Sequence, residues 1–175
     1  SDPITPHSLN KPVCIVTGGS FGIGDAVCEK FSTEGYTVIN LDIQANPAQS
    51  KAIDWRKCDV SVSSQVSECI QHAIKQYGTV NCLVSNAGIH FSGNIEDTNE
   101  DDFERIFGLN VKGAIAATKA VLPQMKSQQN GVILYMASDQ ALIAKHNSFV
   151  YNMSKAALAS MAKTTALDYA KYQIR

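Results

Sequence analysis

Short apolar runs alternate with longer amphipathic stretches along this chain. Residues 13–16 are all apolar, which is typical of a strand buried on both faces. In residues 63–77, apolar side chains recur at offsets of three and four positions, which predicts a helix with one apolar stripe. The same pattern predicts further strands at 36–42, 55–60, 82–84 and 132–137, and helices at 21–34, 99–125 and 149–172.

Local features refine the predicted helices. Thr98 or Asn99 is expected to cap the third helix, because acidic side chains follow at once and are favoured near a helix N-terminus. Pro123 is expected to kink this helix or to interrupt it. The apolar face of the first helix is expected to consist of Ile23, Ala26, Val27 and Phe31.

Alternating strands and helices predict an α/β fold with a doubly wound parallel sheet in three α/β/α layers. We expect residues 12–175 to form a single domain and residues 1–11 to form a flexible N-terminal arm. In such sheets the ligand binds beyond the carboxyl ends of the strands, where the strand order reverses. The residues that follow each strand are therefore the candidates for function.

Composition and charge remove several classes of function. Lys and Arg number 15 and Asp and Glu 16, and this balance argues against nucleic-acid or polybasic membrane-surface binding. Hydrophobic residues make up 45% of the chain, which excludes disorder as the main state. No apolar run approaches the ~20 residues of a membrane span, and no secretory signal is recognisable. Five scattered cysteines indicate buried thiols in a reducing compartment, so we expect a cytoplasmic protein without a metal site.

A glycine-rich turn, Thr17-Gly18-Gly19-Ser20-Phe21-Gly22-Ile23-Gly24, joins the first strand to the first helix. Glycines let backbone N–H groups approach an anion, and the helix N-terminus adds roughly half a positive charge. The turn lacks the Gly-Lys-Ser/Thr sequence of an ATP-binding loop. Its position between a strand and a helix predicts dinucleotide binding rather than an ordinary turn. The expected cofactor-binding residues here are Gly18, Ser20, Phe21, Gly22, Ile23 and Gly24.

Asp42 ends the second strand, 18 residues beyond Gly24. An acid at about this spacing can accept hydrogen bonds from ribose hydroxyls, and it repels a 2′-phosphate. No Arg or Lys occurs in residues 17–24 or 40–50. The sequence therefore predicts NAD in preference to NADP, although a strand-end Asp can also simply cap a turn.

The next strands also end in residues that suit a nucleotide. Asp59 and Val60 close the third strand, and Asn86-Ala87-Gly88 follow the fourth. Small residues and a glycine at this edge allow a nucleotide to pack closely. Each segment alone would be interpreted as a turn, but their shared edge favours a cofactor site.

Residues with acid/base chemistry follow the fifth strand. Ser138 comes directly after it, and Tyr151 and Lys155 open the last helix four positions apart, on one face. A free tyrosine, with a pKa of about 10, is a poor base at neutral pH. A fixed ammonium nearby favours the phenolate, so this pair is a candidate for proton transfer.

Together these residues resemble the short-chain dehydrogenase/reductase family, whose fold is Rossmann-like. The match consists of the spaced glycines of 17–24, Asp59, Asn86-Ala87-Gly88, Asn110, Ser138 and the pair Tyr151 and Lys155, in the family's order. Ser85 departs from the family pattern, which usually has Asn at this position.

The resemblance implies a role for each matched residue. Tyr151 would be the general acid/base, and Ser138 would hydrogen-bond the same substrate oxygen. Lys155 would hold the nicotinamide ribose and assist Tyr151, and Asn110 would hold a water of a proton relay. Asp59 would meet the adenine amino group. The implied function is an NAD-dependent oxidoreductase of a secondary alcohol or ketone.

The family continues beyond Arg175 into further strands and a substrate-covering segment, so we expect this domain to be incomplete at its C-terminus. The alternative hypothesis is therefore a dinucleotide-binding protein, or a fragment, without catalytic activity. His90, Gln140 and His146 are expected to border the substrate, where they would favour a polar one such as a sugar or polyol. The alternative is that they are ordinary loop residues. The last helix and residues 111–128 resemble the family's dimer-forming helices and imply a homodimer or homotetramer.

Overall fold

The computed structural model describes residues 11–137 and 142–175. Of the expected N-terminal arm 1–11 it therefore describes Lys11 alone. Five parallel strands form one sheet with the order β3-β2-β1-β4-β5. The strands are β1 (Val13–Thr17), β2 (Thr37–Asp42), β3 (Asp54–Lys57), β4 (Cys82–Ser85) and β5 (Val132–Tyr135). The order reverses at β1, so the predicted crevice lies at the carboxyl ends of β1 and β4.

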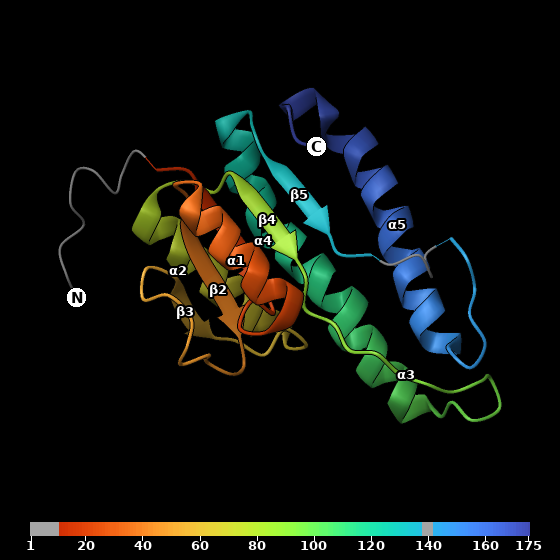
Figure 1. The fold of residues 1–175 in the computed structure, drawn as a ribbon. Coiled ribbons are helices and arrows are strands. Elements are labelled where there is room, and N and C mark those ends of the chain that lie inside the picture. Colours follow the sequence, from red (N-terminus) through yellow and green to blue (C-terminus); the bar gives the residue numbers. More distant parts are fainter. Residues whose placement is uncertain (1–10, 138–141) are drawn as a thin grey trace.

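Helices cover both faces of the sheet (Figure 1). In that view α1 (Gly22–Thr33) lies in front of the sheet, while α2 (Ser63–Tyr77) and α4 (Gly113–Gln128) lie behind it. Beyond β5 lies α5 (Phe149–Tyr169), which is followed by the 3₁₀ turn η4 (Ala170–Tyr172). At the lower end of α4 in this view, α3 (Glu100–Phe107) and the π-helical turn η2 (Gly108–Lys112) lead into that helix. The doubly wound α/β prediction is confirmed.

Alternation along β1 divides the core between these two faces. Val13 and Ile15 belong to the cluster that packs against α2 and α4, whereas Cys14 and Val16 belong to the cluster beneath α1. All four side chains are at most 1% exposed. Successive side chains of a strand point to opposite faces, so a run of apolar residues is needed in a strand that is covered on both sides.

Three predicted element ends need correction. The strand expected at 55–60 ends at Lys57, and the one expected to reach 137 ends at Tyr135. Their neighbours β2 and β4 end opposite those residues, at Asp42 and Ser85, so no further ladder partner exists. The helix predicted at 149–172 is α-helical only to Tyr169.

The expected apolar face of α1 is half wrong. Ile23 is 66% exposed and Ala26 is exposed, while Gly24 and Cys28 are buried. The buried face is rotated because Gly24 packs against the backbone of the glycine-rich turn.

Pro123 does not break its helix. It lies inside α4 on the exposed side, where water can satisfy the Lys119 carbonyl that loses its usual donor. The interruption lies earlier, at the π-helical turn η2. Asn99 is the N-cap of α3, because its side chain accepts a hydrogen bond from the Asp102 N–H at 2.8 Å.

Residues 173–175 run beside β5. Gly131 donates to the Gln173 carbonyl at 3.3 Å, and Arg175 donates to the Gly131 carbonyl at 3.1 Å. Ile133 donates to the Arg175 carbonyl at 2.8 Å. A parallel bridge thus joins Gly131 and Ile174 at the position where the family resemblance places a sixth strand.

Candidate active site

The glycine-rich turn folds closely against the loop after β4. Gly18 has a φ of 66°, in the left-handed region that favours glycine, and a Cβ there would lie 2.9 Å from the Ala87 Cα. A Cβ on Gly24 would collide with the Gly18 carbonyl oxygen and lie 2.6 Å from the Asn86 Nδ2. These two positions therefore require glycine for close approach, as a nucleotide-binding turn does.

Side chains tie this turn to the loop after β4. The Thr17 hydroxyl accepts hydrogen bonds from the N–H groups of Asn86 and Ala87 at 3.0 and 3.1 Å. The Asn86 amide donates to the Gly18 carbonyl at 2.9 Å. Two segments that are nearly 70 residues apart in the chain thus form one rigid unit, and the role of Thr17 was not foreseen from the sequence.

A buried network of polar side chains holds the glycine-rich turn. Asn40 accepts a hydrogen bond from the Gly19 N–H at 2.9 Å and donates to Ser20 and Gln49 at 3.0 and 3.1 Å. Gln49 donates to the Gly19 carbonyl and to Asp25, each at 2.8 Å. Because the network satisfies both backbone groups of Gly19, it fixes the conformation of the turn. No sequence signal marks Asn40 or Gln49, since their partners are distant in the chain.

Asp42 lies where β2 ends, next to the turn. Its two carboxylate oxygens accept hydrogen bonds from the N–H groups of Ser20 at 3.1 Å and Gln44 at 3.0 Å. Each carboxylate oxygen has a further lone pair for a ribose hydroxyl. The Ser20 hydroxyl points inward and donates to the Gln44 carbonyl at 2.5 Å, and the Ser20 carbonyl accepts from the Asn46 amide at 2.7 Å. Ser20 is fully buried, so it braces the turn from inside.

A cavity of about 770 Å³ opens at the carboxyl edge of the sheet. Arg105 and Lys112 add positive charge to its lining, but they pair with Asp102 and Glu104 at 3.4 Å each. Predicted cofactor residues in the lining are Gly18, Phe21, Asp42, Asp59, Val60, Asn86, Ala87 and Gly88, while Ser20, Gly22, Ile23, Gly24, Tyr151 and Lys155 lie outside it.

Asp59 has a structural function as well as a place in this lining. Its carboxylate accepts hydrogen bonds from the Ser61 N–H at 3.0 Å and hydroxyl at 2.6 Å. In these contacts the Asp59 side chain caps its own turn. Cys58 beside it is buried, and burial raises the pKa of its thiol to about 12.

Tyr151 and Lys155 lie one turn apart at the start of α5. The Lys155 ammonium is 5.5 Å from the centre of the Tyr151 ring and donates to the Met136 carbonyl at 2.9 Å. It is also 3.7 Å from the position of a Cβ on Gly88, which lines the cavity. Burial lowers the pKa of Lys155, because desolvation disfavours its charged form.

Asn110 lies in the π-helical turn η2 and is 1% exposed. Its side chain accepts from the Ile89 N–H at 2.8 Å and donates to the Ile89 carbonyl at 3.0 Å. It also lies 3.3 Å from the Ser154 hydroxyl, which donates to the Tyr151 carbonyl at 2.8 Å. Asn110 therefore connects the loop after β4 to the first turn of α5. Ser154, between the two predicted site residues, was not predicted.

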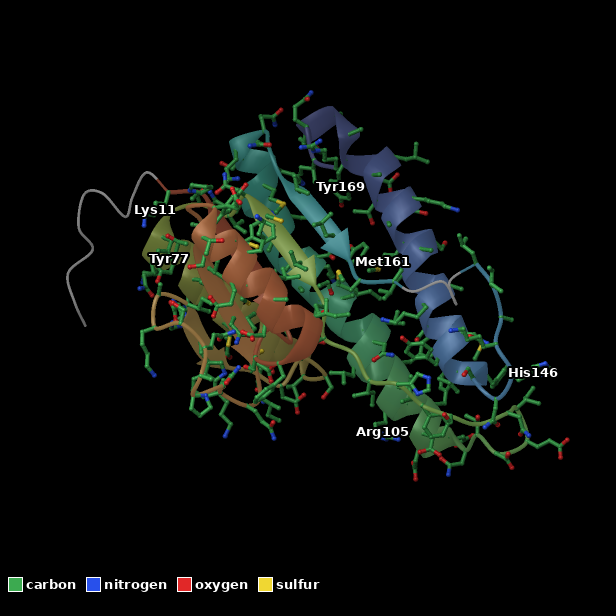
Figure 2. The ribbon with its side chains drawn as sticks, in the orientation of Figure 1. Lys11, Tyr77, Arg105, His146, Met161 and Tyr169 are labelled. Carbon is green, nitrogen blue, oxygen red and sulfur yellow. The ribbon has the colours of Figure 1, made fainter. Side chains whose placement is uncertain are left out.

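Of the residues expected to border the substrate, the structure places one beside Tyr151. His90 packs against Tyr151, with ring centres 4.7 Å apart. His146 lies in the exposed loop before α5, at the same end of the molecule as Arg105 (Figure 2). Ser138 and Gln140 lie outside the described residues.

Comparisons with known proteins agree with this geometry. The short chain dehydrogenase family model matches residues 12–175. The chain belongs to the short-chain dehydrogenase/reductase family. An uncharacterized oxidoreductase of Thermotoga maritima is 33% identical over 93% of this chain and 68% of its own length. An NAD-dependent glycerol dehydrogenase of Listeria innocua is 30% identical over 95% and 68% of the two chains.

The solved structures show the same relationship. The ligand-free aldohexose dehydrogenase of Thermoplasma acidophilum superposes with a TM-score of 0.89 at 40% identity. The match covers 95% of this chain but 64% of that one. This chain thus spans about two thirds of the length of these relatives. The family to which it belongs consists of oxidoreductases that use nicotinamide nucleotides as cofactors.

The residues that the structure describes contain no group of three or more His, Cys, Asp or Glu placed to hold a metal ion. Within the same residues, no helix is long and apolar enough to cross a membrane.

Proposed function

We propose that this protein is an NAD-dependent oxidoreductase that interconverts a secondary alcohol and a ketone, with Tyr151 as the general acid/base. The observation that supports this most strongly is the grouping of Tyr151, Lys155 and Asn110 beside a cavity whose walls suit a dinucleotide. When bound there, the nicotinamide would supply the acceptor or donor of the hydride.

The chain's own residues would manage the proton. In alcohol oxidation the Tyr151 phenolate takes the hydroxyl proton, and in ketone reduction the phenol returns it. The Lys155 ammonium, 5.5 Å from the centre of the ring, would hold the nicotinamide ribose beside the phenol. Asn110 holds the first turn of α5 in place through Ser154, and Ser138 is proposed to hydrogen-bond the substrate oxygen.

Asp42 supports a preference for NAD over NADP. Its carboxylate lines the cavity, and a 2′-phosphate there would meet a fixed negative charge. The basic groups in the lining, Arg105 and Lys112, pair with Asp102 and Glu104, which both lie on α3. We also propose that Asp59 and Val60, which line the same cavity, border the adenine of the cofactor.

The remaining proposals concern substrate, assembly and location. A polar substrate, such as a sugar or polyol, is supported by His90 beside Tyr151 and by the 40% identity to an aldohexose dehydrogenase. A homodimer or homotetramer is supported by a small-residue face of α5, where Ala156 and Ser160 are exposed in the single chain. The five free cysteines suit a reducing compartment such as the cytoplasm.

The test combines turnover and binding in the full-length protein. A panel of polyols, sugars and simple secondary alcohols should yield NADH absorbance with NAD. NADH should bind at least tenfold more tightly than NADPH at fixed salt. Binding of NADH without turnover of any alcohol or ketone would support an inactive dinucleotide-binding protein instead, and tighter binding of NADPH would contradict the role of Asp42.

A further inference from the structure

The loop after β4, residues 89–93, is fixed at both ends. At Ile89, the Asn110 side chain bonds both the N–H and the carbonyl, at 2.8 and 3.0 Å. At Gly93, the N–H donates to the Asn147 carbonyl at 2.7 Å, and the carbonyl accepts from the Phe149 N–H at 3.0 Å. The second attachment is to the residues that immediately precede Tyr151. The position of this loop relative to the start of α5 is therefore determined by the fold.

His90 lies between these two attachments and meets the phenol ring. The ring centres of His90 and Tyr151 are 4.7 Å apart and the planes are inclined by 51°, within the favourable range for aromatic pairs. The Lys155 ammonium contacts the same ring from 5.5 Å. The phenol is thus flanked by an imidazole and an ammonium.

The next residue of the loop points elsewhere. The Phe91 ring lies under the Arg105 guanidinium, 5.8 Å from its centre, and so packs toward α3. His90 is consequently the residue of this pair that faces Tyr151. It is exposed, and among the described residues no hydrogen bond engages its imidazole nitrogens.

We propose that His90 recognises a second hydroxyl group, on the carbon next to the one that is oxidised, while its ring holds the Tyr151 phenol in position. This inference rests on the proposed function and names the substrate class as vicinal diols, including sugars and polyols. A substrate oxygen that exchanges its proton with Tyr151 must lie within about 3 Å of the phenol oxygen. A neighbouring hydroxyl of the same substrate then comes within reach of the imidazole, which can donate or accept a hydrogen bond.

The chemistry of the imidazole favours this class over an apolar one. An alkyl or acyl chain placed against His90 would remove water from the imidazole nitrogens without replacing the lost hydrogen bonds. A vicinal hydroxyl replaces them. One such hydrogen bond corresponds to about tenfold in kcat/KM between a diol and the matching mono-alcohol.

The test separates the two functions of His90 by substitution. His90→Phe keeps a ring against Tyr151 but loses the nitrogens, whereas His90→Gln keeps a hydrogen-bonding group but loses the ring. The assay follows NADH formation in the full-length protein with 2,3-butanediol against 2-butanol and 1,2-cyclohexanediol against cyclohexanol. His72→Phe, a substitution of an exposed histidine on α2, is the matched control.

We expect His90→Phe to reduce the diol preference in kcat/KM about tenfold. We expect His90→Gln to retain the preference within about twofold but to lower kcat about tenfold for both alcohols of a pair, because the phenol is less well held. The control variant should match the wild type. An unchanged diol preference in His90→Phe, or a wild type that turns over the mono-alcohols equally well, would overturn the proposal.

A second measurement does not depend on turnover. In proton NMR spectra of the wild type, ring current from Tyr151 should displace the His90 imidazole C–H signals. The displacement should persist in Tyr151→Phe and disappear in Tyr151→Leu. His90 signals that are the same in Tyr151→Leu and in the wild type would show that the ring contact is absent and would overturn the proposal, whatever the outcome for the alcohols. A wild type that shows the ring contact but oxidises no alcohol would contradict the proposed function instead.

Discussion

Gly24→Ala should weaken cofactor binding much more than it destabilises the fold. The new methyl group would collide with the Gly18 carbonyl oxygen and lie 2.6 Å from the Asn86 Nδ2, where ordinary van der Waals contact begins at 3.4 Å. The glycine-rich turn and the loop after β4 are joined by the Asn86–Gly18 hydrogen bond, so neither can yield alone. We expect the turn to move by on the order of 1 Å.

The magnitudes of the two effects differ. Overpacking of this kind destabilises the fold by about 1–3 kcal/mol, whereas replacing Gly by Ala inside a helix stabilises it by about 1 kcal/mol. The net loss of stability is therefore small. A 1 Å displacement of binding groups, in contrast, costs about a hundredfold in function, or roughly 2.7 kcal/mol. The Kd for NADH should rise about a hundredfold, while the free energy of unfolding falls by no more than about 2 kcal/mol.

The assay is a fluorescence titration with NADH together with urea denaturation of the same samples. Gly35→Ala is the matched control, because Gly35 has a φ of 92° but no atom within 4 Å of an added Cβ. It should lose about 1–2 kcal/mol of stability through backbone strain and keep its NADH affinity. If Gly24→Ala binds NADH within threefold of the wild type, the diphosphate does not rest on this turn and the reasoning is refuted.

Two further predictions concern stability. Burial and then the nearby carboxylates raise the pKa of the Cys28 thiol from 9.0 to about 12, so its contribution to stability is complete below pH 9 and is lost as the pH rises toward 12. Unfolding measured across this window should show a shallower decline for Cys28→Ala than for the wild type, and equal slopes would refute the assignment. Ile70→Ala removes a fully buried side chain and should cost about 2–5 kcal/mol in urea denaturation. Leu167→Ala, at a position 82% exposed, should cost less than about 0.5 kcal/mol, and similar losses in the two variants would contradict the assigned core.

Regular periodicity made much of the fold predictable. The helix predicted at 63–77 is α2 with the same ends, because its apolar stripe and the following Gly78 are local signals. Strand ends were less predictable. Lys57 and Tyr135 end their strands because the neighbouring strands stop, and that information lies elsewhere in the chain.

The candidate site shows the same division. Tyr151 and Lys155 could be paired from the sequence because four positions on one helix bring them to one face. The bonds of Asn110 to Ile89, 21 residues away, could not be foreseen without the fold. The same holds for the contact of His90 with Tyr151, because it depends on how the loop after β4 is fixed against α5.

The central claim is that Tyr151 moves the proton while other residues hold the cofactor. The most direct measurement is therefore turnover and NADH affinity for Tyr151→Phe in the full-length protein. We predict that kcat falls by about 10²–10⁴ while the Kd for NADH stays within threefold of the wild type, because only the proton-transferring hydroxyl is lost. Lys155→Met should impair both quantities. Turnover by Tyr151→Phe within tenfold of the wild-type rate would contradict the account.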